Sequence, residues 1–256
     1  MLEKIKAFFQ MRTQSESGKK QTGKEIDKAK RSSGSQAAPK PPKQKVAAAR
    51  IGELGEHKID LQLDQLPKDC MYMSDLLLPN SKSRTGYSQL DHAVVSPYGI
   101  FVIETKNYAG EIKGARQDRN WRVSNRYNLY NPLLQNKGHI KALQAHLSEF
   151  NGVKYISMIS FTMRCRFSLD PDLRKIHSDE LVVYDVELSE YIARKLLRLK
   201  AELPQRTLSR DEVEAICTKI NGLNVDDAKA RAEHARLAGG RKKETGGVGY
   251  TGDAQS

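Results

Sequence analysis

Cysteine is scarce in this sequence, with three residues in a chain of 256. Cys70, Cys165 and Cys217 lie far apart and form no CxxC pair. Disulfide frameworks and structural zinc sites both depend on grouped cysteines. The pattern therefore indicates neither, and it fits a protein of the reducing cytoplasm.

Long apolar runs are also missing. No stretch approaches the roughly twenty apolar residues of a membrane-spanning helix, and no signal peptide is visible. We therefore expect a soluble intracellular protein without stable membrane insertion. One alternative stays open for the first ten residues, MLEKIKAFFQ, which place Leu2, Ile5, Phe8 and Phe9 at helical spacing. They could form a short amphipathic anchor for a membrane or partner, or only a marginal helix.

The net charge of +12 is unevenly distributed. Residues 1–50 contain thirteen Lys or Arg against four Asp or Glu, whereas residues 51–203 carry a net charge of only +2. The segment 13–45 is also rich in Ser, Gly and Pro, which is typical of a flexible linker. We expect a disordered basic arm over residues 1–45. It is either a solvated leader or an attractor of nucleic acid or an anionic membrane surface.

Helical and β-rich patterns alternate along the middle of the chain. They predict an α/β domain over residues 46–203, with a mixed central β-sheet flanked by helices. Expected helices cover 46–66, the segment from Asn131–Pro132 to residue 150, and 188–199; expected strands cover 71–79, the region around 120–130, 153–161 and 181–186. Residues 204–256 are charged and then Gly-rich, so we expect a flexible tail with one or two short helices.

The clearest element is an antiparallel hairpin at about residues 89–106, within QLDHAVVSPYGIFVIETKNYAG. Two β-rich runs flank SPYG, where Pro97 and Gly99 suit the second and fourth positions of a type I turn. Because side chains alternate across a strand, Glu104 and Lys106 share one face of the second run. Antiparallel pairing brings Asp91 close to their level.

Two carboxylates and an ammonium at one strand end form either an ion-pair cluster or a metal site. In the second case, Asp91, Glu104 and the backbone carbonyl of Thr105 could supply part of the oxygen shell that hard divalent cations prefer. A third acidic group could come from GELGE, residues 52–56. Lys106 would sit beside the bound water, favour its hydroxide form and stabilise the charge that builds on phosphorus. This is the arrangement of a phosphodiesterase.

Four features of the chain resemble the nuclease-related domain (NERD) family, which is placed in the PD-(D/E)xK nuclease superfamily. They are GELGE, QLDHAVVSPYGIFVIETKNYAG, the tryptophan at position 121 and NPLLQNKGH, and the resemblance covers roughly residues 47–200. It implies a restriction-endonuclease-like core and cleavage of nucleic acid with Mg²⁺ or Mn²⁺, with DNA expected over RNA.

The resemblance also implies roles for individual residues. Asp91, Glu104 and Lys106 match the D…ExK motif, Glu56 matches the acidic residue of the first helix with Glu53 as the weaker candidate, and Gln135 matches the glutamine of the helix after the core strands. Leu90 stands where the superfamily motif has proline. The helicase, kinase or zinc-finger domains that often accompany NERD modules are not visible.

Other residues allow two interpretations. His92 points away from Asp91 along its strand and is expected in the core, not as a ligand. His139, four residues after Gln135, could approach the site or be an ordinary surface histidine. A basic and aromatic set would suit contact with nucleic acid, although a solvated hairpin around one buried tryptophan is the alternative. The set comprises Arg119, Trp121, Arg122, Arg126 and Lys137, with Tyr127 beside them.

Two functions remain open at this stage. The first is a magnesium- or manganese-dependent nuclease, and the second is a nucleic-acid-binding or scaffold module that keeps the fold without useful turnover. Nucleic acid is the expected partner in both cases. Protein partners and a homo-oligomeric state stay open.

Overall fold

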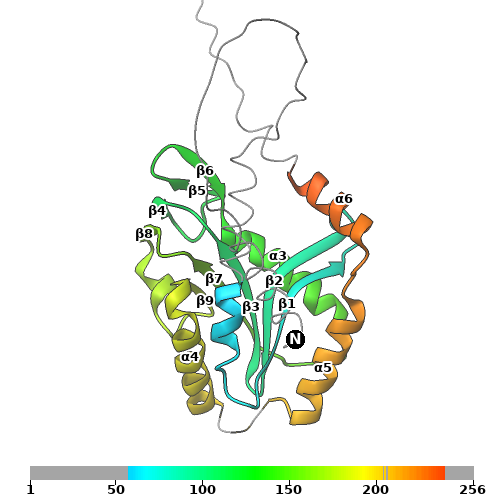
Figure 1. Cartoon of the computed structure of the whole chain (residues 1–256). Helices are drawn as coiled ribbons and strands as arrows, with labels where there is room; N and C mark the ends of the chain where they lie inside the picture. The colour runs from blue at the N-terminus through cyan, green and yellow to red at the C-terminus, as the bar shows by residue number, and fades with distance from the viewer. Residues whose placement is uncertain (1–56, 204, 206, 240–256) are drawn as a thin grey trace, which may run out of the picture. The chain divides into compact units, whose positions relative to one another are not determined.

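The hairpin expected at residues 89–106 lies within the larger of two sheets (Figure 1). The computed structural model describes residues 57–203, 205 and 207–239. Strands β2 (Tyr87–Ser96) and β3 (Gly99–Lys106) pair antiparallel, with Ser96 opposite Gly99. Gly99 has a φ of +143°, and a Cβ atom there would lie 2.5 Å from the carbonyl oxygen of Lys154. The turn therefore requires glycine at this position.

The larger sheet has the strand order β1-β2-β3-β7-β9. β1 (Met71–Pro79) pairs antiparallel with β2, whereas β7 (Tyr155–Phe161) and β9 (Glu180–Tyr184) continue the sheet parallel to β3. This mixture of directions confirms the expected α/β class with a mixed sheet. Because β3, β7 and β9 run the same way, their carboxyl ends lie at one end of the sheet, and Glu104 and Lys106 stand there.

A second sheet of four strands, in the order β6-β5-β4-β8, was not expected. Its strands are β4 (Gly110–Gly114), β5 (Asn120–Val123), β6 (Tyr127–Tyr130) and β8 (Cys165–Leu169). The single strand predicted around residues 120–130 is in fact the hairpin of β5 and β6. Ser124 and Asn125 make its turn with φ values of 50° and 54°, the left-handed conformation that tight hairpin turns favour.

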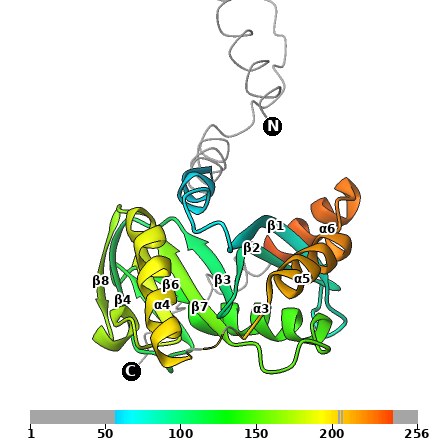
Figure 2. The same cartoon turned by 90° about the horizontal axis from the view of Figure 1, so that it is seen from below.

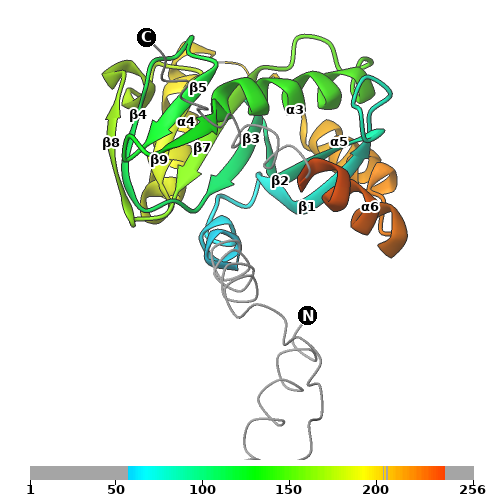
Figure 3. The same cartoon turned by 90° about the horizontal axis from the view of Figure 1, so that it is seen from above.

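Helices cover both faces of the larger sheet. The helical residues 57–63 and α4 (Leu188–Glu202) pack on one face, where α4 is in front in Figure 2. On the other face lie α3 (Pro132–His146) and α5 (Arg210–Leu223) over β1–β3, with the second sheet packing over β7 and β9. Figure 3 shows α3 between the second sheet at one end and α5 and α6 (Ala228–Gly239) at the other. Two short 3₁₀ helices, η1 (Pro171–Arg174) and η2 (Asp185–Glu187), flank β9.

Helix α3 begins as its sequence predicts. Asn131 is the N-cap, and its side-chain oxygen accepts a hydrogen bond from the Leu133 amide at 2.9 Å, with Pro132 in the first helical position. The Asn131 side-chain nitrogen also donates to the carbonyls of Arg116 and Asp118. One buried asparagine therefore fixes both the start of α3 and the loop before β5.

Helix α5 differs from the expected flexible tail. Ser209 and Glu212 form a capping box at its start, and its apolar residues recur at helical spacing. Val213, Ile216 and Ile220 are buried with residues of β1 and β2. The chain after residue 203 therefore contributes a packed layer, because these side chains can leave water only against the sheet.

Several expectations concern other parts of the chain. The basic arm over residues 1–45, the first part of the helix predicted at 46–66 and the Gly-rich end after residue 239 lie outside the described residues. The boundaries of the α/β domain at residues 46 and 203 stay predictions. In the part of the chain that the structure describes, no helix has both the length and the apolar character needed to cross a bilayer.

If α5 is a cooperative part of the fold, Ile216→Ala lowers the free energy of unfolding by about 2–4 kcal/mol, because it leaves a cavity in the core. Thr218→Ala, at an exposed position of the same helix, serves as the control and stays within about 0.5 kcal/mol of wild type. Urea unfolding of the full chain measures both. Equal stability of the two variants would show that α5 is not part of the cooperative core.

Candidate active site

The site begins where β2 and β3 separate. Their backbone pairing ends with His92 opposite Ile103. Beyond this pair, the Asp91 side chain replaces the backbone carbonyl as hydrogen-bond acceptor. Its Oδ2 accepts hydrogen bonds from the Thr105 amide at 2.7 Å and from Thr105 Oγ1 at 2.6 Å. β2 and β3 therefore diverge at this point, which we call the fork, without leaving the Thr105 amide unpaired.

Glu104 is buried beside this fork, with 4% of its surface exposed. Its Oε1 contacts Lys106 Nζ and accepts a hydrogen bond from Gln135 Nε2 at 2.7 Å. Lys106 Nζ also donates to Gln135 Oε1 at 3.1 Å. The three side chains form a closed ring of contacts between β3 and the first turn of α3.

His139 approaches the same carboxylate from the next turn of α3. Its Nδ1 lies 3.3 Å from Glu104 Oε2, and its side chain is only 13% exposed. Of the two interpretations open from the sequence, the structure supports approach to the site over an ordinary surface position. The spacing of four residues from Gln135 was the available signal.

The pKa values of Asp91 and Glu104 are shifted in opposite directions. Burial raises the pKa of Asp91 and the negative charge of Glu104 raises it further, against the lowering effect of the Thr105 hydrogen bonds. Burial also acts to raise the pKa of Glu104, but Lys106 and His139 outweigh it, so this pKa lies below its usual value. Glu104 is therefore charged at neutral pH, and its charge makes ionisation of Asp91 unfavourable.

Asp91 and Glu104 are suited to a hard divalent cation. Both hydrogen bonds of Asp91 go to Oδ2, while Glu104 Oε2 is buried and accepts no hydrogen bond from the described residues. A cation between the carboxylates would relieve their repulsion, and Mg²⁺ is often held by one or two carboxylates plus water and phosphate oxygens. No group of three His, Cys, Asp or Glu able to hold a metal occurs among the described residues. Further ligands would come from water, phosphate, the Thr105 carbonyl or a residue outside that part, such as Glu56.

Comparison with known proteins agrees with this geometry. The family model described as nuclease-related domain, NERD, matches residues 51–162. Residues 51–162, the NERD region of this chain, are thus similar to the nuclease-related domain family. That family belongs to the PD-(D/E)xK-like nuclease superfamily, so the similarity indicates a nuclease-like region. It includes Asp91, Glu104, Lys106, Gln135 and His139.

One relative extends beyond the NERD region. The chain is 29% identical over 192 residues to an uncharacterized protein of Bacillus anthracis, and the match covers 72% of this chain and 82% of that protein. No solved structure matches the chain. The similarity thus reaches past residue 162 but carries no description of activity.

Trp121 in the NERD region is completely buried and belongs to the core between the two sheets. Its Nε1 donates to the Ala115 carbonyl at 2.9 Å. The sequence expectation that Trp121 contacts nucleic acid is therefore wrong, because a buried indole cannot stack on a base. Its basic companions Arg119, Arg122, Arg126 and Lys137 are exposed, as is Tyr127. Glu56 and Glu53 lie outside the described residues.

Asn136 of the NERD region is a positioning residue that sequence reasoning missed. It is buried, and its Nδ2 donates to the Val102 carbonyl and to Ser157 Oγ, both at 2.8 Å. These bonds fix α3 against β3 and β7, so the preceding residue, Gln135, points to Glu104. The available sequence signal was its place in NPLLQNKGH, one of the features that carry the family resemblance.

His92 behaves as expected. It is buried on the opposite face of the sheet, with Nε2 3.3 Å from Asp60 Oδ1. Ser74 Oγ donates to the same Asp60 oxygen at 2.6 Å. These contacts attach the helical residues 57–63 to the sheet.

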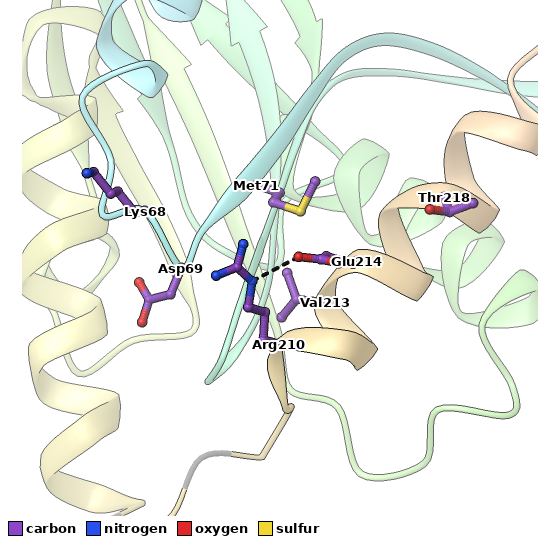
Figure 4. A pocket seen from close by; sticks show the side chains of 7 residues that line it. All are labelled: Lys68, Asp69, Met71, Arg210, Val213, Glu214 and Thr218. Atoms are coloured by element: carbon purple, nitrogen blue, oxygen red, sulfur yellow. Dashed lines mark hydrogen bonds and ion pairs between the residues drawn. The ribbon is translucent and has the colours of Figure 1, made fainter.

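A cavity of about 420 Å³ lies elsewhere, between the start of β1 and α5 (Figure 4). Its lining includes Met71, Arg210 and Glu214, and the last two form an ion pair at 2.9 Å. Met71 is opposite Val95, near the SPYG end of the β2–β3 hairpin, whereas Asp91 and Glu104 lie toward its other end. This cavity is therefore separate from the candidate site.

Asp91→Asn keeps a side-chain oxygen that can accept the Thr105 hydrogen bonds. In the presence of a chelator at neutral pH, this substitution is expected to raise the melting temperature. The reason is that a carboxyl group whose pKa is raised on folding stabilises the folded state only while it is protonated. The gain should shrink as the pH falls toward the ordinary Asp pKa, since wild-type Asp91 is then neutral too. Thermal melts at neutral and acidic pH check this. A melting temperature below that of wild type at neutral pH would contradict it.

Proposed function

We propose that this chain is a divalent-metal-dependent phosphodiesterase that cleaves nucleic acid, with DNA as its preferred substrate. The observation that carries the proposal is the placement of Asp91, Glu104 and Lys106 together at the fork between β2 and β3. A structural salt bridge needs one carboxylate for one ammonium. Here a second carboxylate, Asp91, is present, and burial together with the charge of Glu104 raises its pKa.

The residues have separate roles in this proposal. Asp91 and Glu104 would hold the cation, which when bound polarises a phosphate and lowers the pKa of a coordinated water. Lys106 brings its side-chain nitrogen to the same place, where its ammonium would stabilise negative charge developing on phosphorus. Gln135 orients both Glu104 and Lys106 through its amide, and His139 Nδ1 lies 3.3 Å from the second Glu104 oxygen.

We propose a cytoplasmic setting, which the free thiols of the described residues support. Cys165 and Cys217 are free cysteines, and burial raises the pKa of each to about 11. Such thiols are poor nucleophiles and weak metal ligands at neutral pH. We therefore assign these two thiols no part in the proposed chemistry.

A binding or scaffold module without turnover is the second candidate. The direct contact of Lys106 Nζ with Glu104 favours it, because the ammonium alone can satisfy that carboxylate. Both candidates predict nucleic-acid binding, and only the first predicts cleavage.

Cleavage is tested by incubating the purified chain with supercoiled plasmid, single-stranded DNA and RNA in Mg²⁺ or Mn²⁺. Wild type is expected to cleave DNA, with no cleavage in excess EDTA. Lys106→Ala should lose at least about a hundredfold in rate, since one preorganised charge is worth about that much. Lys141→Ala, at an exposed position of α3, is the matched control and should retain activity. Equal cleavage rates for Lys106→Ala and wild type would contradict the role proposed for Lys106.

Metal binding is tested apart from cleavage by thermal shift. Adding Mg²⁺ or Mn²⁺ should raise the melting temperature of wild type, because a ligand that binds only the folded state stabilises it. Glu104→Gln should remove the shift, whereas Glu149→Gln, at an exposed position, should keep it. A shift that survives in Glu104→Gln would place the metal elsewhere.

A further inference from the structure

The second sheet holds a concentration of positive charge. Residues 110–130 and 163–169, which form its strands and turns, contain seven basic and two acidic residues. Residues 51–203 as a whole carry a net charge of only +2. The rest of that region is therefore net acidic, and the positive charge is local to this sheet.

The two faces of the second sheet differ sharply. Its inner face is apolar and buried, with Ile112, Trp121 and Leu129 in the core. Its outer face carries Lys113 and Arg122, both exposed and directly opposite each other on β4 and β5. Like charges in directly opposite positions destabilise a sheet. Neither forms an ion pair with any carboxylate of the described residues.

Further groups extend this outer face. Arg166 on β8 is exposed, and Arg122 is held in place by Asn128 Oδ1 at 3.1 Å and the Asn125 carbonyl at 2.8 Å. A guanidinium has five N–H donors, so these two bonds leave others free for a ligand. Tyr130, which shares the face of Asn128 on β6, is 43% exposed. Cations and an exposed ring together suit a polyanion that also has aromatic bases.

Chain connections place this sheet next to the candidate active site (Figures 1 and 3). The chain passes from Lys106 into β4 and returns from β6 into α3, whose first turn carries Gln135. β8 follows β7, whose last residue, Phe161, lies opposite Lys106. The second sheet is therefore attached at the catalytic end of the larger sheet.

We propose that the outer face of the second sheet, with Lys113, Arg122 and Arg166, binds the phosphate backbone of nucleic acid and holds it beside the Asp91–Glu104–Lys106 site. This inference rests on the proposed function for its substrate, but it concerns a different surface. Contacts of this kind neutralise phosphates, so they supply affinity that falls with salt and is independent of base sequence.

The test measures binding of the full chain to a labelled single-stranded oligonucleotide and to its duplex, in EDTA so that no cleavage occurs. Lys113→Glu with Arg122→Glu should weaken binding about tenfold or more, and should reduce the slope of log affinity against log salt by about two. Lys200→Glu with Lys229→Glu changes the net charge equally at exposed positions elsewhere and should bind as wild type does. If the first pair impairs folding, Lys113→Gln with Arg122→Gln is judged by the same criterion.

Each outcome is decisive. If Lys113→Glu with Arg122→Glu binds as tightly as Lys200→Glu with Lys229→Glu, the proposed binding surface is wrong, even if wild type cleaves DNA in the metal assay. Binding that depends on Lys113 and Arg122 supports the surface, even if wild type cleaves nothing and the nuclease proposal fails. If Lys113→Glu with Arg122→Glu weakens binding to anionic lipid vesicles by the same factor as binding to the oligonucleotide, the surface binds anions in general. That result would overturn the assignment to nucleic acid.

Discussion

The bond between the Asp91 carboxylate and the amide and hydroxyl of Thr105 is the interaction on which the site depends. It ends the pairing of β2 with β3 while keeping the last amide satisfied. It also holds one carboxylate close to another in a place that excludes most water. The energetic conflict between Asp91 and Glu104 is thus a product of strand geometry, and it is what makes the fork suited to a cation.

Local signals in the sequence were enough for the centre of the fold. Pro97 and Gly99 predicted the turn, strand alternation placed Glu104 and Lys106 on one face, and Asn131 with the following proline predicted the start of α3. Each of these inferences needs only neighbouring residues. The grouping of Asp91, Glu104 and Lys106 was therefore predictable in outline before any long-range contact was known.

Long-range contacts account for what the sequence did not predict. β4 and β8 are short strands that pair in parallel across more than fifty residues of chain, and neither has a clear alternating pattern of its own. The apolar spacing of α5 was present, but its partners on β1 and β2 lie far back in the sequence. Trp121 was misassigned because arginines surround it in sequence, whereas its alternation with them across β5 turns it inward.

The insertion of β4, β5 and β6 between Lys106 and Gln135 has a consequence for assembly. These two residues meet only after residues 107–134 have folded and returned the chain to the same place, so closing the site carries the entropy of closing that loop. The larger sheet can pair β2 with β3 through a tight turn much earlier. Assembly of the candidate site should therefore be a late event in folding, and a nascent or partly folded chain would already hold its hairpin while Lys106 and Gln135 are still apart.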